Sequence, residues 1–137
     1  MCLALWRVAD PGNVGTLLRT ADAFGACVAL SDGCADPLSP KALRASAGAV
    51  FRVPVLSWNE APGRRIALVA HGGMPLADVD LESPLSFLLG SERGELPDLA
   101  TDWCKVTIPL LGTAESLNVA TAGAIALYEL ARRSSPR

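Results

Sequence analysis

The sequence predicts an α/β domain with a mostly parallel sheet flanked by helices. Short apolar runs bounded by Gly, Pro, Asp or Ser recur along the chain, and such runs are typical of buried strands. Helical patterns lie between several of them, which favours parallel strands joined by crossover helices. A length of 137 residues is about that of one domain and is long enough for a real core.

The expected elements follow from this alternation. Strands are expected at residues 2–8, 26–31, 52–56, 66–70, 85–90 and 105–111. Helices are expected at residues 14–24, 39–48 and 117–133. The chain has no internal repeat, and only the final "RRSSPR" reads as a frayed tail.

The first expected helix has one apolar face. That face carries Val14, Leu17, Leu18, Ala21 and Phe24 at the i, i+3, i+4, i+7 spacing. Asn13 stands where an N-cap is expected. Arg19 points away from this face, toward small residues that would let another molecule approach closely, although a solvated arginine is the alternative.

The last expected helix is apolar on most of its sides. Its apolar residues are Leu117, Val119, Ala120, Ala122, Ala124, Ile125, Ala126, Leu127, Leu130 and Ala131. A helix of this kind must be covered on more than one face. Because one small domain offers one sheet to pack against, we expect a second subunit on the remaining face, most simply in a two-fold dimer.

Composition argues against a membrane protein and against a metal or disulfide framework. No apolar stretch approaches the roughly 18 residues that a membrane span needs, and the N-terminus breaks off too early for a secretion signal. We therefore expect a cytoplasmic protein. The four cysteines lie far apart and His71 is the single histidine, so neither a zinc site nor a set of disulfides is supported.

Charge is divided unevenly along the chain. The net charge is −2, yet the segment between residues 38 and 65 is basic and contains a single acidic residue, Glu60. They are Lys41, Arg44, Arg52, Arg64 and Arg65. This segment is either a modest patch that meets phosphates or an ordinary solvated surface.

Common motifs of nucleotide-binding and hydrolytic enzymes are absent. No G-x-G-x-x-G follows the first strand, and no phosphate-loop pattern G-x-x-x-x-G-K-[ST] occurs. No G-x-S-x-G elbow accompanies His71, and "AHGGMP" reads as a turn after a strand.

Three loops remain, each at the carboxyl end of an expected strand, where open α/β sheets usually bind ligands. They are "DPGNVGTLLRTADAFG" (10–25), "LLGSERGELP" (88–97) and "IPLLGTAESLNVA" (108–120). In this order they closely resemble the three signature motifs of the SpoU/TrmH branch of the SPOUT methyltransferase superfamily. The connecting segment 36–55 is also similar to that family, so the resemblance covers essentially the whole chain.

The resemblance implies an enzyme that uses S-adenosylmethionine, without a metal, to methylate a ribose 2′-hydroxyl in tRNA or rRNA. It also implies a SPOUT fold with a deep trefoil knot near the C-terminus, which the general rule against threaded chains would have excluded. It further implies a homodimer whose interface includes the last helix. The residues at the family's cofactor-binding positions are Leu89, Gly90, Ile108, Leu110 and Leu117.

The family's catalytic positions correspond to Asn13, Arg19, Glu92, Ser116 and Asn118. A guanidinium is a poor base, so we expect Arg19 to stay charged, grip the RNA and stabilise the developing alkoxide, with phosphate or water taking the proton. The resemblance implies that Glu92 orients Arg19 or Asn13. It implies that Ser116 and Asn118 tie the loop together, and an N-cap role for Ser116 is a compatible alternative.

Two departures from the family pattern affect the expected activity. In "GSERGEL", Arg93 and Glu95 replace two glycines, and Ala120 stands where the family often has serine. A non-catalytic RNA-binding or assembly protein on the same scaffold is therefore the alternative function, and methylation of a base nitrogen is a third. The chain is expected to be one domain, residues 1–137, without an N-terminal RNA-binding extension; it is either a minimal enzyme or an excised catalytic domain.

Overall fold

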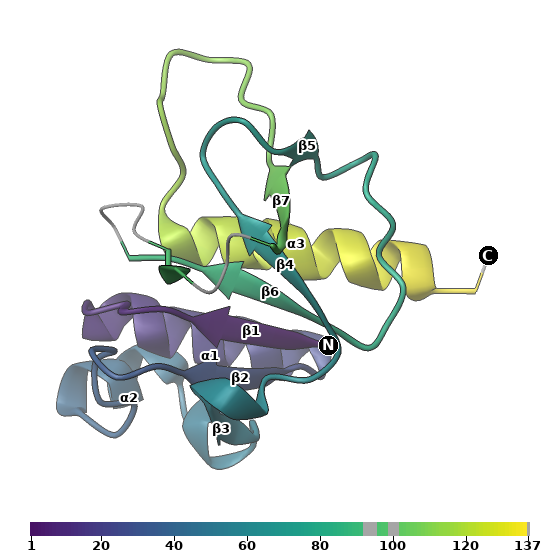
Figure 1. Ribbon diagram of the computed structural model, residues 1–137. Helices are drawn as coiled ribbons and strands as arrows, with labels where there is room; N and C mark the ends of the chain where they lie inside the picture. The colour runs from purple at the N-terminus through teal and green to yellow at the C-terminus, as the bar shows by residue number, and fades with distance from the viewer. Residues whose placement is uncertain (92–95, 99–101, 137) are drawn as a thin grey trace.

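A computed structural model describes residues 1–91, 96–98 and 102–136. The strands are β1 (Cys2–Leu5), β2 (Cys27–Leu30), β3 (Val55–Ser57), β4 (Arg64–Leu68), β5 (Met74–Pro75), β6 (Leu85–Leu89) and β7 (Cys104–Thr107). They form one sheet in the order β3-β2-β1-β6-β4-β7-β5, and every pairing in it is parallel. The expected mostly parallel α/β fold is thus confirmed (Figure 1).

The helices are α1 (Pro11–Phe24), α2 (Pro40–Ser46) and α3 (Val119–Ser134), with short 3-10 turns η1 (Ala49–Phe51) and η2 (Trp58–Glu60). All three expected helices and all six expected strands are present, with shifted ends. The seventh strand, β5, was not predicted. It is only two residues long and exposed, so it has none of the apolar pattern that marks a buried strand.

The prediction of Asn13 as the N-cap of the first helix was wrong. Asp10 is the N-cap, and its Oδ1 accepts from the backbone N–H groups of Gly12 and Asn13. Pro11 then occupies the first helical position, where its missing N–H leaves no hydrogen bond unmade. The helix therefore begins one turn earlier, and Asn13 lies inside its first turn.

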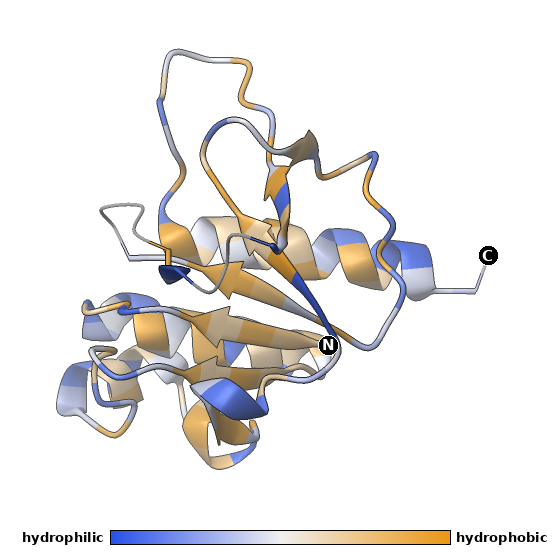
Figure 2. Cartoon of the chain, viewed as in Figure 1, coloured by the Kyte–Doolittle hydropathy of each residue, from blue (hydrophilic) through white to orange (hydrophobic). Residues whose placement is uncertain are grey.

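The main core lies between the sheet and the two long helices. Figure 1 shows α1 and α3 on the far side of the sheet, and Figure 2 shows β1, β2 and β6 mostly in hydrophobic colours. The side chains of Leu3, Leu17, Phe87 and Leu127 are fully buried there. The predicted apolar face of the first helix is confirmed, with Phe24 only partly buried.

Gly123 allows α3 to approach this core closely. A Cβ at residue 123 would stand 2.6 Å from Leu17 Cδ2 and 3.0 Å from Leu89 Cδ1, closer than real Cβ atoms normally come. The absence of a side chain therefore lets α3 rest directly on α1 and β6. This contact brings the N-terminus of α3 to the carboxyl edge of the sheet.

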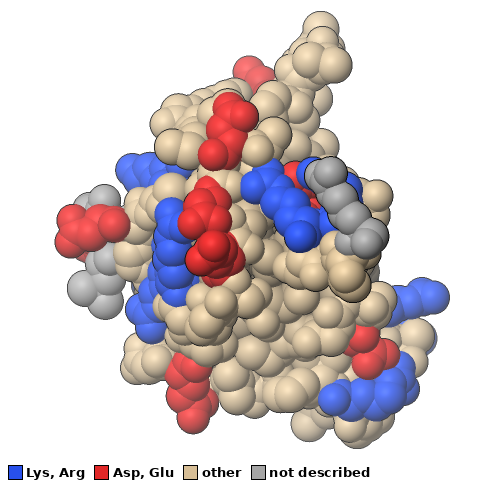
Figure 3. Space-filling view, turned by 90° about the vertical axis from the view of Figure 1, so that its right-hand side faces the viewer, with Lys and Arg blue, Asp and Glu red and all other residues tan. Residues whose placement is uncertain are grey.

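The basic residues 41–65 do not form one patch. Arg52 pairs with Asp22 at 2.8 Å and Lys41 lies 3.9 Å from Asp10, both at exposed positions. Side chains alternate along a strand, so Arg64 and Arg65 lie on opposite faces of β4. Acidic and basic groups are intermixed in Figure 3, which favours the alternative of an ordinary solvated surface for most of this segment.

No helix in the described ranges is both long and apolar enough to cross a membrane.

Candidate functional site

A cavity of about 550 Å³ lies at the carboxyl ends of β4, β6 and β7, beside the start of α3. Neighbouring parallel strands end at the same sheet edge, so the loops that follow them converge there. The cavity is lined by Leu68, Val69, Ala70, His71, Leu89, Gly90, Ser91, Leu96, Ile108, Leu110, Glu115, Ser116, Leu117, Asn118, Val119 and Ala122. Its size is within the usual range of roughly 300 to 1,000 Å³ for small-molecule sites.

All five residues expected to bind a cofactor line this one cavity. Leu89 and Gly90 come from the end of β6, Ile108 and Leu110 follow β7, and Leu117 precedes α3. Two chain segments separated by residues 91–107 thus meet around the same space. The geometry agrees with the prediction that these positions form a binding site, without itself assigning the ligand.

The residues expected to be catalytic are only partly brought together. Ser116 and Asn118 line the cavity, and Asn118 Nδ2 donates to Asn13 Oδ1 at 3.1 Å. Arg19 is exposed on α1 and is not among the cavity's lining residues. Glu92, together with Arg93 and Glu95 of the altered motif, lies outside the described residues.

The N-cap of α3 is Asn118, so the suggested capping role of Ser116 was wrong. Asn118 Oδ1 accepts from the N–H groups of Ala120 at 2.9 Å and Thr121 at 3.2 Å. The helix begins at Val119, so Ser116 lies three residues before its first residue and too far out to cap it. One amide side chain therefore caps α3 through its oxygen and reaches α1 through its nitrogen.

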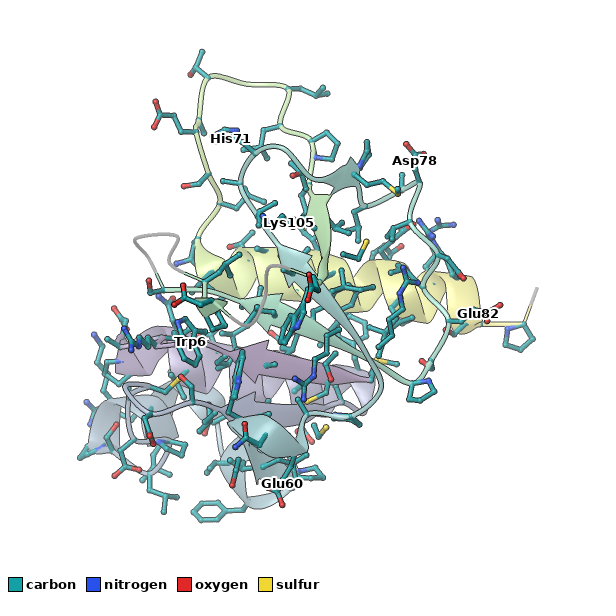
Figure 4. All side chains as sticks on the ribbon, in the orientation of Figure 1. Trp6, Glu60, His71, Asp78, Glu82 and Lys105 are labelled. Atoms are coloured by element: carbon teal, nitrogen blue, oxygen red, sulfur yellow. The ribbon has the colours of Figure 1, made fainter. Side chains whose placement is uncertain are left out.

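Sequence reasoning missed the part of the wall that follows β4. His71 was interpreted as a turn residue, yet it lines the cavity (Figure 4), as do Leu68, Val69 and Ala70. Strand order places this segment at the site: β4 lies between β6 and β7, and the segments after both of those strands were predicted to line the site. That order depends on pairings distant in sequence and is not written in any local pattern.

Ser91 supplies a polar group to the cavity wall. Its Oγ is buried and, among the residues the structure describes, has no hydrogen-bond partner. A buried hydroxyl without a partner is costly, and such groups in native proteins usually serve a ligand or a mechanism. Ser91 lines the cavity, so it is positioned to bond a polar atom of a bound molecule. Within the described ranges, no three His, Cys, Asp or Glu side chains gather where they could hold a metal ion.

Comparison with known proteins identifies the family. Residues 1–128 match the model described as the SpoU rRNA Methylase family. The chain belongs to the SpoU methylase family. The predicted resemblance is thereby confirmed over nearly the whole sequence.

Two proteins similar to this chain are named as rRNA methyltransferases. It is 39% identical over 142 residues to the 23S rRNA (guanosine(2553)-2'-O)-methyltransferase RlmP of Bacillus subtilis, covering 93% of this chain and 56% of that protein. It resembles the crystal structure of an AdoMet-bound rRNA methyltransferase from Sinorhizobium meliloti, with a TM-score of 0.89 and 37% identity, covering 98% of this chain and 57% of the other.

A second similar structure is described as giving insights into the 2-OH methylation of C/U34 on tRNA. Its TM-score is 0.87 at 29% identity, with 96% of this chain and 94% of that chain covered. By contrast, this SpoU chain spans about half the length of the curated relatives it matches, 50% and 56% of two of them.

Proposed function

We propose that this SpoU chain methylates a ribose 2′-hydroxyl in rRNA or tRNA, with S-adenosylmethionine as methyl donor. One observation carries the proposal: all five positions that match the family's cofactor-binding residues line a single cavity. Relatives named as rRNA 2′-O-methyltransferases and a similar structure with bound AdoMet support it. The proposed site of action is the cytoplasm, where these RNAs are found.

The residues present fit this cofactor. Leu89, Ile108 and Leu110 offer apolar contact to an adenine ring, and Gly90 lets the main chain approach without an intervening side chain. The unpartnered Ser91 hydroxyl offers a bond to a polar part of the molecule. When bound, S-adenosylmethionine supplies an activated methyl group.

The protein must align the acceptor and help it lose a proton. In our proposal the charged Arg19 grips an RNA phosphate and the ribose oxygen and stabilises the developing alkoxide, while phosphate or water takes the proton. Asn13 and Asn118, joined at 3.1 Å, hold the starts of α1 and α3 together beside the cavity. Ser116 and Asn118 are proposed to help place the reacting groups, and Glu92 is proposed to orient Arg19 or Asn13.

A homodimer through α3 would complete the site. Arg19 does not line the cavity of its own chain, so it acts on a substrate there only if a second copy presents it or the RNA reaches across. On α3, Ile125 is 36% exposed and Tyr128 is 58% exposed, while Leu111 on the loop before α3 is fully exposed. Exposed apolar side chains of this size favour burial against a second copy.

We also infer that the chain is knotted as in the rest of the family. β6 lies between β1 and β4, β7 lies beyond β4, and α3 then returns to pack on α1. This order supports a chain that passes through its own earlier loop. Pulling single molecules from both termini would test it, because a tightened knot leaves the extended chain shorter than an unknotted one.

Methyl transfer itself is tested with labelled S-adenosylmethionine and purified rRNA and tRNA, followed by nucleoside analysis. A 2′-O-methylated nucleoside supports the proposal, and a methylated base overturns it. The alternative, a non-catalytic RNA-binding or assembly protein, is separated by calorimetry: no heat with millimolar S-adenosylmethionine would favour it over the enzyme.

A further inference from the structure

The sheet face opposite the long helices carries all three tryptophans of the chain. Trp6, Trp58 and Trp103 pack there against Ala67 and Leu88. In Figure 1 this face is toward the viewer, crossed by η2, while α1 and α3 lie behind the sheet. Each of the three indole side chains is only half-buried.

The three rings and two arginines form a continuous row of contacts, here called the Trp–Arg ladder, in which the Trp6 ring is tilted by 57° to the Trp58 ring. Arg7 Cζ lies 5.1 Å from the centroid of Trp6, whose ring is 5.0 Å from Trp58. Trp58 stacks on Trp103 at 6.0 Å with an interplanar angle of 13°. Arg65 Cζ lies 5.1 Å from Trp103. Each end of the row therefore carries a guanidinium in cation–π contact with an indole.

Arg7 is held in an unfavourable backbone conformation. Its φ of 52° is in the left-handed region, which costs energy for a residue with a side chain. Its N–H donates to Ser31 Oγ at 2.9 Å, and the missing side chain of Gly33 leaves room for the Arg7 side chain. The turn after β2 therefore keeps Arg7 at the carboxyl end of β1, against Trp6.

A third cation lies on the same face. Side chains alternate along β7, and Trp103 belongs to the ladder, so Lys105 points to the ladder side (Figure 4). Lys105 is exposed and pairs in register with Ala67, which the tryptophans cover. Arg64, one residue before Arg65, points to the opposite face and donates to the carbonyl of Asp80.

The ladder adjoins the proposed cofactor cavity. Leu96 packs with the tryptophans and also lines the cavity, and the backbone N–H of Trp6 donates to the carbonyl of Leu89 at the cavity wall. An RNA strand bound at the mouth of the cavity can therefore continue onto this face. Arginine planes backed by aromatic rings suit bases and phosphates of unpaired RNA.

We propose that the Trp–Arg ladder and Lys105 form an RNA-binding surface that holds a single-stranded part of the substrate next to the methylation site. The inference rests on the proposed function, since it takes RNA as the substrate. Arg7, Arg65 and Lys105 contact phosphates and bases. Trp6 and Trp103 hold the guanidinium groups of Arg7 and Arg65 in place before RNA binds.

Arg65→Gln and Arg64→Gln make a matched pair for the test, because they remove the same charge from adjacent residues on opposite faces. Binding of a labelled mixed-sequence single-stranded RNA of about 16 nucleotides is measured by fluorescence anisotropy at several salt concentrations. We expect Arg65→Gln to weaken binding about threefold to tenfold and to reduce the salt slope by about 0.7. Arg64→Gln should change neither, and Arg65→Lys should restore the slope but only part of the affinity.

Intrinsic fluorescence gives a second readout, since every tryptophan lies in the ladder. RNA should change the emission of the wild-type protein, and in methyl-transfer assays Arg65→Gln should raise KM and leave kcat unchanged. Equal effects of the two glutamine variants, or no effect of either, would overturn the ladder as an RNA surface and leave this face to a protein partner. If the wild-type protein binds no RNA, the proposed function fails as well.

Discussion

Asn118 Nδ2 donates to Asn13 Oδ1 at 3.1 Å, joining side chains that are 105 residues apart. The contact links the first turn of α1 to the start of α3, and the same Asn118 side chain caps α3 through its oxygen. Two of the three family motifs are therefore connected by one amide. This makes Asn118 the most informative position for separating the stability of the site from its chemistry.

Asn118→Ala should lower the free energy of unfolding by about 1–2 kcal/mol, because it leaves two helix N–H groups without their acceptor. Asn118→Asp keeps a capping oxygen and should retain most of that stability. Chemical denaturation of both variants measures the difference. An aspartate variant as unstable as the alanine variant would show that capping is not the source of the effect.

Ser91→Ala should have opposite effects on folding and on cofactor binding. The buried Oγ has no hydrogen-bond partner among the described residues, and an unsatisfied buried hydroxyl costs free energy, so its removal should raise the free energy of unfolding by about 1 kcal/mol. If the hydroxyl bonds S-adenosylmethionine, affinity should fall about fivefold to tenfold, which is the worth of one hydrogen bond. Calorimetry and denaturation measure the two effects, and unchanged affinity would remove Ser91 from the site.

Arg19→Ala should reduce methyl transfer at least about a hundredfold, the usual loss when one stabilising charge is removed from a transition state. It should not weaken S-adenosylmethionine binding, since Arg19 does not line the cavity. Its stability should change by less than about 0.5 kcal/mol, because the side chain is exposed. Full activity in this variant would exclude Arg19 from the mechanism.

Gly15→Ala should destabilise the domain by about 2 kcal/mol or more. An added Cβ would lie 2.5 Å from the carbonyl oxygen of Ala42 and 2.6 Å from the Cβ of Ala45, and the backbone of α2 cannot yield without moving the helix. Gly112→Ala is the matched control, because its Cβ would meet nothing within 4 Å. Thermal unfolding of the two variants should differ clearly, and similar melting temperatures would contradict the close contact of α1 and α2.

Acid should weaken the end of α3. Hydrogen bonds from Arg132, and then from Arg133, lower the pKa of Glu129 to about 2. A carboxylate whose pKa is depressed on folding stabilises the protein above its unfolded pKa, so this contribution is complete above about pH 4.5 and is lost as the pH falls toward 2.

Glu129→Gln should remove this pH-dependent part, about 1 kcal/mol after allowance for solvent screening. The free energy of unfolding of the wild type and the variant should therefore converge as the pH falls from 5 to 2. Arg133 also donates to the carbonyls of Leu76, Ala77 and Val79, so it keeps the segment after β5 in place in both proteins. Parallel pH profiles would contradict the assigned role of Glu129.

Much of the architecture was determined by local sequence. The alternation of apolar runs and helical patterns predicted the parallel sheet and its three helices, because strand burial and helix amphipathicity each leave a periodic signal. The motif residues Leu89, Gly90, Ile108, Leu110 and Leu117 were recognisable from the sequence motifs alone. The side chains that close the cavity from the β4 side were not, and neither was the cap of α1.

What only the tertiary structure decided is which segments meet. The insertion of β6 between β1 and β4 brings His71 to the cavity wall, and the same sheet gathers three tryptophans from distant segments onto one face. These pairings depend on long-range hydrogen bonds and packing, which no short window of residues encodes. Local patterns specify which residues are buried and in which kind of element, whereas the partners of each buried or polar group follow from how the whole chain packs.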